Sequence, residues 1–143
     1  QRSICALHSD EMNAVGKSGG CLGFEPDTTL LFRYSALTFN GHRIHTDHPY
    51  VTQVEGYPDL VVPGSLHTIL MFELARTQAP TPPRYKSIAW RNVRPLFVNR
   101  PLTTCGEPAA DGKSAKLWVV DNTGALSLSS AQAVGSPSSP SAL

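Results

Sequence analysis

The stretch PGSLHTILMFELART, residues 63–77, decides the fold of this chain. It begins with Pro63, a residue that suits the first turn of a helix, and from Leu66 to Thr77 it leaves hardly any polar face. A helix that is apolar nearly all round is a buried one, so we expect a long, buried central helix here. Its few polar interruptions are His67, Thr68, Glu73 and Arg76.

Four strand-like segments follow this helix, at residues 85–94, 102–107, 113–120 and 125–133. Turn residues at 111–112 and at 121–124 separate the last three of them. A buried helix followed by an antiparallel meander predicts an α+β domain, in which a curved antiparallel sheet wraps around the helix. We expect this single domain to span residues 24–134. Residues 1–23 are expected to form an irregular lead-in or first strand, and residues 135–143 a disordered Ser/Pro-rich tail.

The part of the domain before the central helix begins with a shorter helix. Asp27 or Thr28 is suited to cap its first turn, and Asn40-Gly41 is expected to end it, because glycine tolerates the left-handed conformation. The following stretch, residues 42–63, contains prolines and glycine and is predicted to be a long loop. Long loops in compact domains are usually functional.

Composition narrows the classes of function. The 143 residues carry 12 Lys+Arg and 11 Asp+Glu, a formal net charge of +1, which argues against binding to nucleic acid or an anionic membrane. No apolar run reaches the about 18 residues of a membrane span. Cys5, Cys21 and Cys105 lack CxxC spacing, so we expect three reduced thiols and neither a disulfide framework nor a metal site.

Several motifs within residues 28–106 resemble one enzyme group. They lie at residues 31–45, 47–50, 54–58, 60–64, 91–97 and 104–106. These segments are similar to the hydroxyacyl-thioester dehydratases type 2, the MaoC-like enoyl hydratases and above all the mesaconyl-CoA (3-methylfumaryl-CoA) hydratases. The resemblance implies a hot-dog fold.

The resemblance also implies a catalytic loop. MaoC-like hydratases carry Asp-x-Asn-Pro-x-His, and residues 40–45 align with it so that Asn40 stands at the aspartate position and His45 at the histidine position. His45 is expected to be the general acid/base, because imidazole titrates near neutrality. Asn40 cannot act as a base but is expected to orient a water.

A second implied element is the start of the central helix. Free N–H groups there suit the oxygen of a thioester enolate, and the resemblance assigns that role to Gly64, with Pro63 and Ser65 beside the substrate. Relatives usually read Val-Val-His-Gly-Pro at this point, so Pro63 replaces a histidine.

Three further residues are candidates for substrate binding. Tyr50 is expected to line the acyl tunnel. Arg91 and Arg94, three apart on a predicted strand, would point to opposite faces, and one of them would contact a carboxylate or phosphate of the substrate. Surface pairing with an acid is the alternative for both arginines.

The leading hypothesis is a lyase that adds or removes water across the α,β-bond of an acyl thioester of coenzyme A or a carrier protein, without metal or redox cofactor. The alternatives are a thioesterase, for which Glu73 or Asp59 would activate water, and a non-catalytic hot-dog domain that binds an acyl or polyketide-like ligand.

The resemblance implies a homodimer, because related enzymes complete their site across two hot-dog units. We expect an intracellular protein, cytoplasmic or mitochondrial, since the C-terminal Ser-Ala-Leu is a poor peroxisomal address. Mesaconyl-CoA-type relatives have a longer N-terminal half, which suggests that the sequence is a fragment.

Overall fold

A computed structural model describes residues 20–78, 84–110 and 114–136 of the chain. Within these ranges the elements follow one another from an edge strand through three helical segments to a long helix and four strands. In chain order they are β1 (Gly20–Phe24), α1 (Thr28–Leu37), the 3-10 helix η2 (Arg43–His45), α2 (His48–Gln53), α3 (Gly64–Gln78), β2 (Arg84–Asn92), β3 (Leu102–Pro108), β4 (Ser114–Val120) and β5 (Leu126–Ser136).

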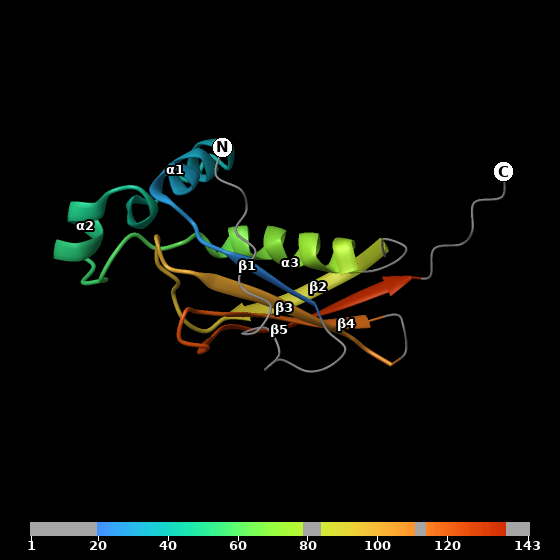
Figure 1. The fold of residues 1–143 in the computed structure, drawn as a ribbon. Coiled ribbons are helices and arrows are strands. Elements are labelled where there is room, and N and C mark those ends of the chain that lie inside the picture. The colour runs from blue at the N-terminus through green and yellow to red at the C-terminus, as the bar shows by residue number, and fades with distance from the viewer. Residues whose placement is uncertain (1–19, 79–83, 111–113, 137–143) are drawn as a thin grey trace.

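The strands form one antiparallel sheet in the order β1-β3-β4-β5-β2, with β1 and β2 at its edges. Helix α3 lies across one face of this sheet, and α1 and α2 gather at the end where α3 begins (Figure 1). The helix packs against β3, β1 and β4. The predicted α+β architecture, a sheet with one long helix on it, is confirmed.

The core lies between α3 and the sheet. Gly106 of β3 allows the close approach, because a Cβ atom added there would lie 2.7 Å from Leu117 and 3.2 Å from Leu74 of α3. The residues of the core that are at most 2% exposed include Leu31, Val51, Val62, Met71, Leu74, Val98, Leu102, Leu117, Val119 and Leu128.

Helix α3 is buried on one face only, which corrects the prediction of a helix buried all round. Met71 and Leu74 are inaccessible to solvent or nearly so, whereas Ile69 is 53% exposed and Phe72 is 37% exposed. Sequence shows that a face is apolar, but it does not show what covers it. In this chain a single sheet lies on one side of the helix.

Helix α1 begins as predicted and ends differently. The Asp27 carboxylate accepts a hydrogen bond from the Leu30 N–H at 2.7 Å, which confirms the expected cap. The left-handed residue at the exit is Phe39, with φ 52°, and not Gly41. The Asn40 N–H donates to the Ser35 carbonyl and the Phe39 N–H to the Ala36 carbonyl, the pattern of a Schellman ending.

The stretch predicted to be one long loop contains two helical turns, η2 and α2. Asp47 caps α2 by accepting a hydrogen bond from the Tyr50 N–H at 3.1 Å. Pro49 lies in the first turn of α2, where its missing N–H costs nothing. The proline taken as a sign of loop is therefore compatible with a short helix.

The described residues cover only part of the predicted lead-in and of the predicted tail. Gly20 to Gly23, assigned to the lead-in, form an edge strand together with Phe24, so the alternative of a first strand holds for these residues. Gly135 and Ser136, assigned to the tail, belong to β5. The predicted turn at 111–112 and the rest of the lead-in and tail lie outside the described residues. No helix in the described part of the chain is long and apolar enough to cross a membrane.

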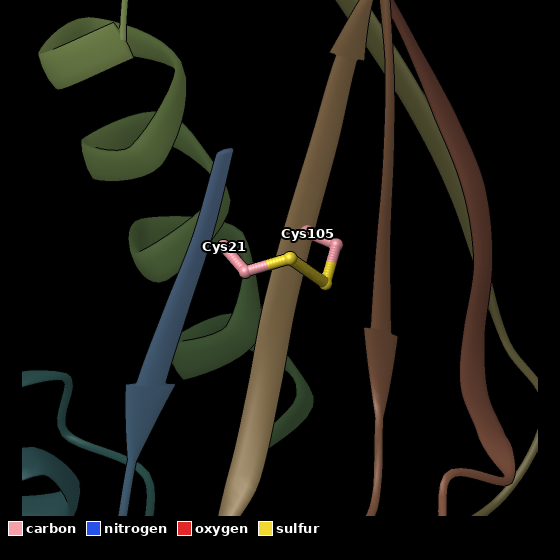
Figure 2. Close-up of a disulfide and its surroundings, with 2 residues drawn as sticks. All are labelled: Cys21 and Cys105. Carbon is pink, nitrogen blue, oxygen red and sulfur yellow. A yellow bond between two sulfur atoms is a disulfide. The ribbon is translucent and has the colours of Figure 1, made fainter. Parts of the chain in front are cut away.

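Cys21 and Cys105 form a disulfide (Figure 2), so the prediction of three reduced thiols is wrong for this pair. The two cysteines stand directly opposite each other in the β1–β3 ladder, with their Cα atoms 4.2 Å apart. They are 84 residues apart in sequence, a distance at which spacing alone reveals no pairing. Cys5 lies outside the described residues.

We expect reduction of this disulfide to lower the free energy of unfolding by about 2–4 kcal/mol, because the bond restricts a long loop of the unfolded chain. Urea unfolding with and without a reductant measures the difference. Titration of thiols in denaturant checks the bond itself, since the chain has three cysteines. Three reactive thiols in the unreduced protein would contradict the pairing.

Candidate active site

A short ladder of backbone hydrogen bonds holds the segment that leads into α3. The Val61 N–H donates to the Ile44 carbonyl at 2.9 Å, and the Val62 N–H donates to the Leu96 carbonyl at 2.8 Å. On the same side as Leu96, the Val98 N–H donates to the Leu60 carbonyl at 3.0 Å. Residues 60–62 therefore lie between the η2 segment and residues 96–98, and this fixes the position of the start of α3.

His45 is bound to this ladder. It is the last residue of η2, its side chain is buried, and its Nδ1 lies 2.7 Å from the Val61 carbonyl oxygen. A carbonyl oxygen only accepts hydrogen bonds, so Nδ1 carries the proton and donates it. In the neutral ring, Nε2 is then the unprotonated nitrogen, with a lone pair available to a substrate.

Burial lowers the pKa of His45 below its ordinary value. The hydrogen bond to Val61 raises this pKa and the neighbouring His42 lowers it, both by less than burial does. The rings of His42 and His45 meet edge to face, with centroids 5.7 Å apart. His45 is therefore neutral at neutral pH, in the form that accepts a proton.

The start of α3 is formed by Pro63, Gly64 and Ser65. Pro63 is fully buried, and its carbonyl accepts the Leu66 N–H at 3.0 Å. Gly64 is half-buried and Ser65 is exposed. As the first residues of the helix, Gly64 and Ser65 have N–H groups with no carbonyl one turn earlier inside it. His45 is thus bonded to the carbonyl of Val61, which stands three residues before Gly64 in the sequence.

Asn40 lies in the turn between α1 and η2. Its Oδ1 accepts a hydrogen bond from the His42 N–H at 3.1 Å, so this oxygen stabilises the turn that leads to His45. Its amide N–H groups are the part of the side chain left for a water. The expected water-orienting role remains a prediction.

Tyr50 belongs to a polar cluster on α2. Its hydroxyl donates to Glu55 at 2.5 Å, and the Arg43 guanidinium lies 4.0 Å from the centre of its ring. The hydrogen bond to Glu55 is the main reason why the pKa of Tyr50 is raised. Arg43 also bonds Asp47 at 2.8 Å. The expectation that Tyr50 lines an acyl tunnel stays a prediction.

Arg91 and Arg94 do not share a strand, which corrects the prediction that placed both on residues 85–94. Strand β2 ends at Asn92, because the N–H groups of Val93 and Arg94 both turn to the Ser127 carbonyl, at 2.8 and 3.1 Å. Both arginines are exposed. Whether either one contacts a substrate anion stays a prediction.

Two polar residues near α3 were not expected from the sequence. Asn92 lies against Gly64, and its amide nitrogen would be 2.6 Å from a Cβ atom placed there. His67 is 3% exposed, and neither of its ring nitrogens has a hydrogen-bond partner. Asn92 stands inside the motif at residues 91–97, for which the sequence predicted a role only for the arginines. His67 was predicted to be a polar interruption of an apolar helix.

A family model and two curated relatives match this chain. The model of hydroxyacyl-thioester dehydratase type 2 matches residues 11–98. A mesaconyl-C(4)-CoA hydratase of Chloroflexus aurantiacus is 44% identical over 102 residues, covering 71% of this chain and 36% of that protein. A mitochondrial hydroxyacyl-thioester dehydratase type 2 of Schizosaccharomyces pombe is 39% identical over 97 residues, covering 67% of this chain and 31% of that protein.

The fold has solved counterparts. An (R)-hydratase from A. caviae involved in PHA biosynthesis superposes with a TM-score of 0.75 at 20% sequence identity, covering 84% of this chain and 95% of that one. This likeness supports the hot-dog fold. The chain spans about a third of the length of the curated relatives it matches. Because the family model matches residues 11–98, more than half of the chain, the chain belongs to the hydroxyacyl-thioester dehydratase type 2 family.

Proposed function

We propose that the chain carries the catalytic site of a hydro-lyase that adds or removes water at the α,β-bond of an acyl thioester. The observation that carries this proposal is the 2.7 Å hydrogen bond from His45 Nδ1 to the Val61 carbonyl. It ties the buried ring to the segment that leads into α3 and leaves Nε2 as the nitrogen without a proton. The names of the family and of its mesaconyl-C(4)-CoA hydratase relative support the same reaction class.

In the hydration direction, His45 Nε2 takes a proton from the water whose oxygen bonds to the β-carbon. The π electrons of the α,β-bond move toward the carbonyl oxygen, and the Gly64 N–H stabilises the enolate that forms. The imidazolium then returns the proton to the α-carbon. Dehydration is the reverse. The thioester itself acidifies the α-carbon, so these steps use only groups of the chain, the substrate and water.

A thioesterase is less well supported. Glu73 lies in the third turn of α3, where it pairs with Arg76 at 2.6 Å on the surface. Asp59 accepts the Leu60 N–H at 2.8 Å and faces His48 at 3.6 Å. Both carboxylates proposed to activate water are thus engaged elsewhere. The non-catalytic alternative is favoured by Pro63, which stands where relatives carry a histidine.

An assay with 2-enoyl and 3-hydroxyacyl thioesters of coenzyme A and of a carrier protein separates these functions. We expect the enoyl absorbance to fall without release of free thiol. Thiol release at the rate of substrate loss would identify a thioesterase. No turnover of any thioester, with retained binding, would identify the non-catalytic domain.

We also propose that the chain acts as a homodimer. Helix α3 packs against β1, β3 and β4, while β2 is an edge strand. On β2 itself Trp90 is 40% exposed, and on α3 Ile69 and Phe72 are also exposed apolar side chains. Apolar side chains beside an open strand edge favour association. Sedimentation equilibrium is expected to give twice the mass of 15.4 kDa, and the monomer mass at micromolar concentration would contradict it.

For location, we propose a mitochondrial protein. The Schizosaccharomyces pombe relative is named as mitochondrial, and this name supports the proposal.

A further inference from the structure

The Asn92 side chain lies directly against the start of α3. A Cβ atom added to Gly64 would be 2.6 Å from Asn92 Nδ2 and 3.6 Å from its Oδ1, and the first distance is too short for any real Cβ contact. The φ of Gly64 is not positive. A side chain at position 64 would therefore meet the Asn92 carboxamide, which would have to shift to admit it, whereas the backbone conformation itself does not demand glycine.

The backbone around Asn92 is held on both sides. Asn92 is the last residue of β2 and stands opposite Leu128 of β5. The next two N–H groups, of Val93 and Arg94, both donate to the Ser127 carbonyl, and the Ser127 hydroxyl donates to the Arg94 carbonyl at 2.7 Å. Ser127 is buried. The contact between Asn92 and Gly64 is thus built by the fold and not by a free loop.

The carboxamide itself has hydrogen-bonding capacity left over. The Asn92 side chain is exposed, and among the residues that the structure describes, none forms a hydrogen bond with it. A carboxamide carries two N–H donors and one acceptor oxygen. Of its two polar atoms, the amide nitrogen lies closer than the oxygen to the position that a Cβ of residue 64 would take.

We propose that the Asn92 carboxamide donates a second hydrogen bond to the thioester carbonyl oxygen, beside the Gly64 N–H. This inference rests on the proposed function. When the water oxygen bonds to the β-carbon, the α,β π pair moves toward the carbonyl oxygen, and two donors stabilise that charge better than one. The backbone that carries Asn92 is held by β5, so its carboxamide is placed beside the start of α3.

The competing explanation is that Asn92 only fills space. Four variants separate the two roles: Asn92→Ala, Asn92→Asp, Gly64→Ala and the double variant Gly64→Ala/Asn92→Ala. Asn122→Ala is the matched control, because Asn122 is an exposed asparagine in the turn between β4 and β5. Each variant is measured for thermal stability, for kcat and KM on an enoyl thioester, and for the absorbance of a bound dimethylaminocinnamoyl thioester of coenzyme A.

We expect Asn92→Ala to lower kcat by about 10²-fold, as the loss of one oxyanion donor does, with little change in KM or thermal stability. Asn92→Asp is expected to lower kcat at least as much, because a carboxylate repels the developing charge. The bound cinnamoyl thioester absorbs at longer wavelength when its carbonyl is polarised. This red shift should shrink in both Asn92 variants and stay unchanged in Asn122→Ala.

The double variant distinguishes an Asn92 side chain that only fills space from one that donates a hydrogen bond to the thioester. If the Asn92 amide is a donor, its removal from Gly64→Ala should leave kcat low, whereas if it only fills space its removal should restore the kcat that Gly64→Ala loses. If Asn92→Ala keeps the kcat and the red shift of the wild type, the residue only packs and the proposal is wrong. If the wild type itself neither binds nor converts any thioester, the proposed function fails first, and the Asn92 proposal fails with it.

Discussion

His45→Ala is expected to lower kcat for hydration of a 2-enoyl thioester by about 10²–10⁴-fold, the usual contribution of a positioned acid/base. The buried ring donates from Nδ1 to Val61, which leaves Nε2 as its proton acceptor. The Val61 N–H is bonded separately to the Ile44 carbonyl, so the ladder survives the substitution. KM should change little, because the imidazole acts on the proton transfers. Assays that follow the enoyl absorbance during the reaction measure both kcat and KM.

His48→Ala is the matched control, since His48 lies nearby on α2 but its side chain is 59% exposed. It should keep the kcat of the wild type. Burial lowers the pKa of His45, so the base form persists below the ordinary pKa of histidine. The acid limb of the wild-type pH–rate profile should therefore fall below that value. A His45→Ala variant with wild-type kcat would remove the histidine from the mechanism.

The second large effect concerns stability in acid and depends on His67. Burial lowers the pKa of this histidine to about 4, whereas the unfolded chain titrates near the ordinary value of about 6.5. Because the folded pKa is the lower one, the stability is fully present above pH 6.5 and is lost as the pH falls toward 4. The difference between the two pKa values corresponds to a loss of about 3 kcal/mol in the free energy of unfolding.

We expect His67→Leu to remove this loss. Urea unfolding of the wild type and the variant, followed between about pH 7 and pH 4, should show the wild type losing more free energy of unfolding. At neutral pH the variant should be as stable or more stable, because both ring nitrogens of His67 are buried without partners. His48→Leu, an exposed histidine, serves as the control. Parallel pH curves for wild type and His67→Leu would contradict the buried, neutral state of His67.

The fold could be predicted from the sequence where one residue pattern decides one element. The apolar run at 66–77 became α3, and the four strand-like segments became β2 to β5 with ends that differ by a few residues. The prediction failed where a partner distant in sequence decides. The exposure of Ile69 depends on which face the sheet covers, and the Cys21–Cys105 bond depends on the register of β1 and β3.

The candidate site was predictable only in part. The motif at 40–45 pointed to His45, but its partner, the Val61 carbonyl, is a backbone group that no side-chain pattern reveals. Asn92 was missed because its importance comes from contact with Gly64, which depends on how residues 96–98 pair with 60–62. Phe39 ended α1 in place of Gly41 because the backbone hydrogen bonds of the exit outweighed the preference for glycine.

The central claim is that His45 presents an unprotonated Nε2 at the amino end of α3. Nitrogen-15 NMR of the labelled histidine ring measures this directly, with His45→Gln used to assign the signal. At pH 7 we predict a neutral ring with the proton on Nδ1, and a changed Nε2 resonance when a saturated acyl thioester of coenzyme A is added. A ring protonated on Nε2 instead, or an Nε2 signal indifferent to the thioester, would contradict the account.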